Sequence, residues 1–110
     1  MRSERERLLD IFEAIERIEK YAEDGKDAFD ADELIQTWIV HHITIIGEAC
    51  RSLPDDFQAR YASVPWADII GMRNILVHHY FGIDTEAVWS VVVRDIPELK
   101  LNIQVILKNI

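Results

Sequence analysis

The sequence predicts an all-α fold, an antiparallel bundle of four to five helices in a single domain spanning residues 1–110. Apolar residues recur every three to four positions over most of the chain, which is the spacing of amphipathic helices. No alternating pattern or hairpin turn signature favours β-structure. The length of 110 residues, with 49% hydrophobic and 29% charged residues, suits one globular domain.

The first predicted helix spans residues 4–23 and ends before Gly25, with apolar side chains along one face. Asp30, followed by Glu33 three residues later, imitates a capping box and predicts a second helix that runs to about Ser52. Apolar residues surround most of this second helix, which indicates burial on more than one side. Its polar residues collect in a narrow stripe: Thr37, His41, Thr44, Glu48 and Arg51.

The second half of the chain predicts two or three further helices. Residues 54–64 are expected to form a loop, and Pro65 then opens a third helix from about Trp66 to His78 or Tyr80, with Gly82 as its terminator. A fourth helix opens near Asp84 or Thr85. Pro97 is expected to interrupt or kink it before a last apolar stripe over residues 99–110.

The charge is strongly negative and unevenly distributed. Twenty acids against twelve bases give a net charge of −8, and residues 1–33 alone hold twelve of the acids and six of the bases. This acidity argues against a nonspecific nucleic-acid binder, which needs a basic stripe. The rest of the chain is nearly neutral, so a local site for a polyanion stays open.

Cysteine content and hydropathy predict a cytoplasmic protein. The single cysteine, Cys50, has no partner for an internal disulfide and cannot build a thiolate metal site, which favours a reducing compartment. The start of the chain lacks the pattern of a signal peptide, and the apolar stretch 38–47 is too short to span a bilayer.

An arginine, an amide, two histidines and a phenol lie close together in residues 73–80, at the end of the third predicted helix. On an ideal helix Arg73 and His78 are about 140° apart. They can meet at one ligand only if the helix loosens before His78 or if a second copy of the chain supplies half of the site. A packing role is the alternative, since the helix dipole favours a terminal histidine and Tyr80 can serve as a core aromatic residue.

The second helix offers weaker candidates. Its polar stripe is either a solvated face or the wall of a site, and His42, on the apolar side, is expected to be a core or interface histidine. The neighbouring histidines His41 and His42 diverge on a helix, as do His78 and His79, and no acid is well placed beside either pair. No metal site is therefore predicted.

Several short segments together resemble the HepT-like family of HEPN domains, over nearly the whole chain. They are Ile46-Gly47-Glu48-Ala49, Leu53-Pro54, residues 65–74 (PWADIIGMRN), residues 78–84 (HHYFGID), Val88-Trp89 and residues 96–99 (IPEL). The central motif of the family, R-x4-H-x-Y, is matched at all three fixed positions by Arg73, His78 and Tyr80.

This resemblance implies the toxin of a prokaryotic toxin–antitoxin pair, acting as a homodimeric, metal-independent endoribonuclease. Arg73 and His78 would be catalytic and line a cleft between the two protomers, with Asn74 and Glu48 as supporting residues. The antitoxin would be a nucleotidyltransferase that uses ATP and Mg²⁺ to transfer AMP to Tyr80. No cofactor is expected for cleavage itself.

Two other interpretations are open. The first is a noncatalytic helical module that binds a nucleotidyltransferase or serves as its substrate, which the net charge of −8 favours. The second is a purely structural bundle in which the motif serves packing and dimerisation. A structural Tyr80 would be buried, whereas a substrate Tyr80 must be reachable.

Overall fold

The computed structural model describes residues 2–78 and 82–110, and the fold is all-α, as predicted, with one very short β pair. The elements in chain order are α1 (Glu4–Ala22), α2 (Lys26–Ala31), α3 (Glu33–Arg51), α4 (Asp55–Arg60), α5 (Trp66–Leu76), β1 (Val77–His78), β2 (Gly82–Ile83), α6 (Thr85–Ser90), the π-helix η1 (Val91–Asp95) and α7 (Ile96–Asn109).

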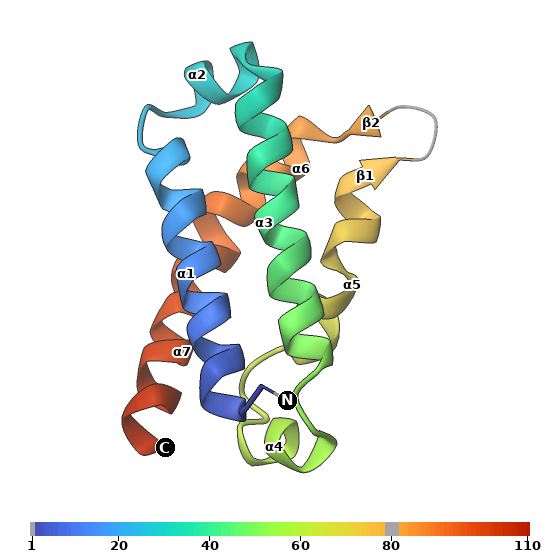
Figure 1. Ribbon diagram of the computed structural model, residues 1–110. Helices are drawn as coiled ribbons and strands as arrows, with labels where there is room; N and C mark the ends of the chain where they lie inside the picture. Colours follow the sequence, from blue (N-terminus) through green and yellow to red (C-terminus); the bar gives the residue numbers. More distant parts are fainter. Residues whose placement is uncertain (1, 79–81) are drawn as a thin grey trace.

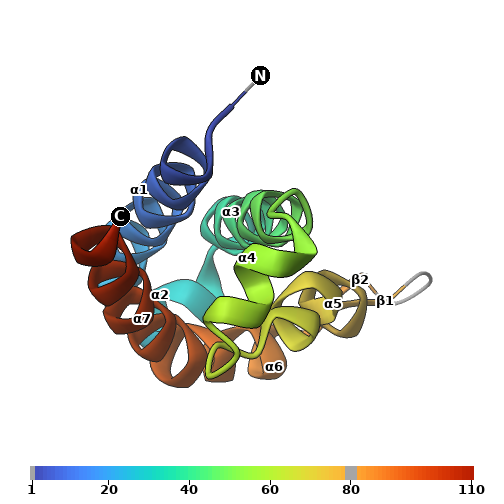
Figure 2. The same cartoon turned by 90° about the horizontal axis from the view of Figure 1, so that it is seen from below.

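Four helical segments form an antiparallel bundle: α1, α3, α5 and the continuous run α6–η1–α7 (Figure 1). Seen along the bundle, α3 lies between α1 and α5, and α7 lies beside α1 (Figure 2). Helix α4 covers the end of the bundle where α1 begins and α7 ends (Figure 1). The β1–β2 pair lies beyond the end of α5 that is opposite α4 (Figure 1), and its Val77 and Ile83 side chains pack against the edge of the core.

The core consists of the apolar stripes that the sequence predicts. Helices α1 and α3, each 19 residues long, contribute the largest shares of it, and α7 closes it. Burial of these side chains supplies most of the stability, because isolated helices of this length are marginal in water. The largest fully buried side chains include Leu8, Ile11, Ile15, Ile18, Phe29, Ile39, Ile43, Ile46, Phe57, Leu76, Val88 and Ile103.

The second predicted helix does not begin at Asp30, so that prediction is wrong. Asp30 lies inside α2, and α3 starts after Asp32, whose carboxylate accepts a hydrogen bond from the Leu34 amide at 2.9 Å. Asp32 has the extended backbone of a cap residue, which separates the two helices. The buried Gln36 amide joins them by donating to the carbonyls of Phe29 and Asp30.

The loop predicted at residues 54–64 contains the helix α4. Its anchor is Phe57, which is fully buried. The indole of Trp66, at the start of α5, donates to the carbonyls of Gln58 and Tyr61 at 3.2 and 3.1 Å. These contacts hold α4 over the end of the bundle.

Helix α5 ends at Leu76, earlier than the predicted end at His78 or Tyr80. Val77 is extended, and the pairs Val77–Ile83 and His78–Gly82 form an antiparallel ladder. Gly82 has a φ of 72°, a conformation that favours glycine. The expectation of no hairpin is therefore wrong, and Gly82 belongs to the hairpin rather than to a helix end.

The predicted interruption at Pro97 takes the form of a change in helix type. The π-helix η1 runs directly into α7, the Ile96 amide donates to the Val91 carbonyl, and Pro97 follows in the first turn of α7. None of the helices described is both long enough and apolar enough to cross a bilayer.

Candidate functional site

Three of the predicted site residues line one small cavity between α3 and α5. Arg73 and Asn74, from the last turns of α5, face Glu48 of α3 across a cavity of about 60 Å³. The structure thus brings the predicted catalytic arginine and both supporting residues together. The remaining lining residues are Ile43, Thr44, Gly47, Arg51, Ile69 and Ile70.

The spacing of α3 and α5 is set at Gly47. A Cβ atom built there would lie 3.5 Å from the carbonyl oxygens of both Ile69 and Ile70. These two residues stand one helical turn before Arg73 and Asn74, so the close approach at Gly47 fixes how the cavity residues sit relative to α3.

The Arg73 guanidinium is exposed and, within the described residues, makes no hydrogen bond or ion pair. Glu48 lies 3.7 Å from Arg51 instead, in a pair whose side chains are both more than half exposed. The positive charge of Arg73 is therefore free for an anion, and a guanidinium fork matches the oxygens of a phosphate.

The end of α5 at Leu76 places His78 outside the helix, in β1. The angle of an ideal helix between Arg73 and His78 therefore does not apply, and the helix loosens before His78, which was one of the two conditions for a shared site. Tyr80 and His79 lie outside the described residues. A contribution from a second copy of the chain stays a prediction.

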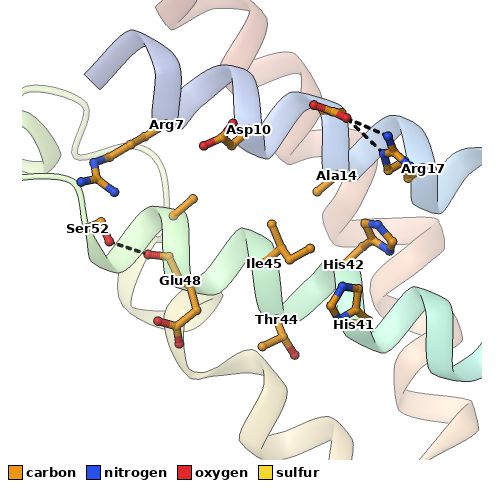
Figure 3. A pocket seen from close by; sticks show the side chains of 12 residues that line it. Arg7, Asp10, Ala14, Arg17, His41, His42, Thr44, Ile45, Glu48 and Ser52 are labelled. Carbon is orange, nitrogen blue, oxygen red and sulfur yellow. Dashed lines mark hydrogen bonds and ion pairs between the residues drawn. The ribbon is translucent and has the colours of Figure 1, made fainter. Parts of the chain in front are cut away.

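The polar stripe of α3 forms part of a larger groove against α1, with a volume of about 430 Å³ (Figure 3). His41, Thr44 and Glu48 line it from α3. The facing side chains of α1 are Arg7, Asp10, Glu13, Ala14 and Arg17. The spacing of three and four residues between Arg7, Asp10, Glu13 and Arg17 places them on one side of α1, and this was the signal in the sequence for the groove.

His42 is a core histidine, as predicted. It is 4% exposed, its Nδ1 lies 2.8 Å from the Trp38 carbonyl oxygen, and its ring packs on the indole of Trp38. Burial lowers the pKa of His42, against the opposing effect of the Trp38 carbonyl, and the nearby His41 and Arg17 lower it further. The neutral form is thus favoured in the folded protein.

This burial makes a prediction for stability. Because the pKa of His42 is lower in the folded than in the unfolded chain, the unfolded chain takes up the proton first as the pH falls below about 6.5. The contribution of neutral His42 to the free energy of unfolding should be complete above that pH. It should be lost as the pH falls toward the lower pKa of the folded state. Urea unfolding at several pH values should show a smaller decrease for His42→Gln, and equal decreases would contradict the assignment.

Two other chemistries find no support in the described residues. Burial raises the pKa of the Cys50 thiol to about 12, so this cysteine is not an activated nucleophile. Over residues 2–78 and 82–110, no three histidine, cysteine or acidic side chains gather as metal ligands would. Metal-independent cleavage itself stays a prediction.

The sequence of this chain matches a family model and several known proteins. A model of the family described as "Ribonuclease HepT-like" matches residues 11–106. A Thermococcus cleftensis protein named "Probable ribonuclease HepT" is 39% identical over 90% of this chain and 91% of its own length. A candidate RNase of Methanocaldococcus jannaschii is 34% identical over 90% of this chain and 92% of its own length.

A further relative from Methanocaldococcus jannaschii, named as both a gamma-glutamylcyclotransferase and a candidate RNase, is 41% identical over 91% of this chain. The chain spans 46% of the length of that protein. No solved structure matches significantly. The family model covers most of the chain and two relatives are matched along nearly their whole length, so this chain belongs to the ribonuclease HepT-like family.

Proposed function

We propose that this protein is a metal-independent endoribonuclease and the toxin of a toxin–antitoxin pair. The observation that carries the proposal is the Arg73 guanidinium, which has no partner among residues 2–78 and 82–110 and lines a cavity with Asn74 and Glu48, in a chain of the ribonuclease HepT-like family. Because no described carboxylate pairs with Arg73, its guanidinium can hold the phosphate oxygens of RNA.

The proposed reaction is attack by the 2′-hydroxyl of RNA on the adjacent phosphorus. The bond from phosphorus to the 5′-oxygen breaks, leaving a 2′,3′-cyclic phosphate on one fragment and a 5′-hydroxyl on the other. His78 exchanges the protons, because an imidazole titrates near neutrality. Arg73 stabilises the charge that develops on the phosphate oxygens, and Asn74 and Glu48 support the site.

The proposed mechanism requires a homodimer. One histidine in each chain is too few to act as base and acid in the same step, whereas two protomers that share a cleft supply two. Dimerisation therefore belongs to the proposed mechanism. Sedimentation equilibrium checks it directly, and a monomer that cleaves RNA at full rate would contradict it.

The experiment that tests the activity is cleavage of total RNA and tRNA by the purified, unmodified protein in EDTA. We expect fragments with 2′,3′-cyclic phosphate ends. Cleavage that appears only when a divalent ion is restored would overturn metal independence. Absence of cleavage by protein of confirmed unmodified mass would favour the noncatalytic module, for which the acidic composition is the supporting observation.

We further propose that a nucleotidyltransferase antitoxin silences the enzyme by transferring AMP from ATP, with Mg²⁺, to Tyr80. The added phosphate would repel RNA and its nucleoside would obstruct the cleft. Incubation with the partner, ATP and Mg²⁺ should add the mass of one AMP per chain and abolish cleavage. Tyr80→Phe should take up no AMP, and modification of another residue would contradict the assignment.

A further inference from the structure

We propose that the groove between α1 and α3 is an RNA-binding surface that continues the cavity of Arg73, with Arg7 as a phosphate contact and Tyr21 as a base-stacking contact. The proposal rests on the ribonuclease function proposed above. It assigns a role to α1, which the motif does not include.

The groove and the Arg73 cavity adjoin along α3. Thr44 and Glu48 line both, so a strand that leaves the Arg73 cavity across this turn of α3 enters the groove without crossing another element. At one end of the groove Arg7 reaches from α1 toward Ser52, and at the other end lie Arg17 and His41 (Figure 3). Arg7 and Arg17 are ten residues apart, which is about 15 Å along a helix.

The charge of this groove differs from that of the chain as a whole. Three of its acids already have arginine partners: Asp10 pairs with Arg2 at 2.6 Å, Glu13 with Arg17 at 2.9 Å and Glu48 with Arg51 at 3.7 Å. These pairs cancel the acids that would otherwise repel a phosphate chain.

Arg7 takes no part in these ion pairs. Among the described residues its guanidinium has no hydrogen bond or ion-pair partner, as is also true of Arg73. Arg7 also borders a recess at the same end, whose other charged lining residues are Arg2, Glu4 and Arg5. Arg7 and Arg73, each without a described partner, thus line the two connected hollows, whereas Arg94 lines neither, and this placement favours a polyanionic ligand.

The other end of the groove offers aromatic rings. Glu13, Glu16 and Arg17 also line a neighbouring recess with Lys20, Tyr21 and Trp38, so the two bases of this recess offset its two acids. The rings of Tyr21 and Trp38 meet edge to face with centroids 5.1 Å apart, and Tyr21 is 40% exposed. Aromatic rings flanked by cations are typical of surfaces that bind single-stranded RNA, where bases stack and phosphates pair.

The test measures binding separately from cleavage. In a His78→Ala background, binding of a fluorescent single-stranded RNA of about 12 nucleotides is followed by anisotropy over a range of salt concentrations. Arg7→Ala should weaken binding roughly tenfold at low salt and reduce the salt slope by about 0.7, the effect of one lost phosphate contact on a single strand. Tyr21→Ala should also weaken binding roughly tenfold, and Tyr21→Phe should restore it, because stacking needs the ring.

The matched control is Arg94→Ala. Arg94 is exposed on η1, lines neither hollow and, like Arg7, has no partner among the described residues. The control should bind RNA as the parent does. If Arg7→Ala and Tyr21→Ala also bind as the parent does, or if the parent does not bind, the inference is overturned. It is equally overturned if Arg7→Ala changes the oligomeric state, because the groove would then be a contact between copies.

A second readout separates this inference from the proposed function. A dinucleotide has a single phosphate, which Arg73 would hold, so its cleavage by the parent with His78 intact tests the proposed function without the groove. If the parent cleaves the dinucleotide and Arg7→Ala binds the longer RNA as the parent does, only the groove proposal is overturned. Loss of binding in Arg7→Ala, with no cleavage of any RNA by the parent, supports the groove and overturns the ribonuclease.

Discussion

Replacing His78 with alanine is expected to lower the rate of RNA cleavage by about 10²- to 10⁴-fold, the usual contribution of a positioned proton-transfer group. Arg73→Ala should lower it by roughly 10²-fold or more, since a preorganised charge contact to the developing anion contributes about 3 kcal/mol. Initial rates on a defined tRNA in EDTA, with protein of confirmed unmodified mass, measure both effects.

Controls make these losses interpretable. His78→Asn keeps a polar side chain that cannot carry a proton at neutral pH, so it should be as inactive as His78→Ala. Arg94→Ala removes an exposed arginine away from the cavity and should cleave at the parental rate. Circular dichroism should show unchanged helix content for all of them. Parental activity in His78→Ala would remove His78 from the mechanism.

Substituting valine for Gly47 should both destabilise the protein and impair the site. Its branched methyl groups would extend beyond a Cβ that already lies 3.5 Å from the carbonyl oxygens of Ile69 and Ile70, forcing α5 away from α3. Overpacking of this kind costs about 1–3 kcal/mol of unfolding free energy. Displacing Arg73 by about 1 Å would cost roughly a further 10²-fold in cleavage rate.

Gly47→Ala is the matched control. A single Cβ at 3.5 Å is an ordinary van der Waals contact, and alanine is favoured over glycine in a helix by up to about 1 kcal/mol. This variant should therefore be at least as stable as the parent and fully active. Denaturant unfolding and cleavage rates together test the pair, and equal behaviour of the valine and alanine variants would show that Gly47 does not set the helix spacing.

The long helices could be predicted because their apolar stripes recur over three or more turns. Helices α2 and α4 could not, since each has six residues and is held by one buried aromatic side chain, Phe29 or Phe57, rather than by a stripe. The β1–β2 pair has two residues in each strand, which is too short for an alternating pattern. Periodicity also could not distinguish the π-helix before Pro97 from a simple kink.

The site could be predicted only in part, and largely through the resemblance. Spacing alone favoured a packing role for the residues of the motif, and the absence of any described partner for Arg73 is visible only in the tertiary structure. The meeting of Glu48 with Arg73 depends on the close approach at Gly47, which no pattern within one helix encodes. The role proposed for Arg7 could not be predicted either. An arginine in an acidic helix is typical of a solvated face, and the groove exists only where α1 packs beside α3.

The two chain ends and the β1–β2 pair occupy opposite ends of the bundle. Arg60 of α4 lies 3.8 Å from Glu4, and Arg5 donates to the carbonyl of Leu107, so the start of α1 and the end of α7 are neighbours at the α4 end (Figure 1). A 19-residue helix such as α3 is about 28 Å long. A tether, fluorophore or fused domain joined at either terminus would therefore lie at the α4 end of the bundle, away from the β1–β2 pair (Figure 1).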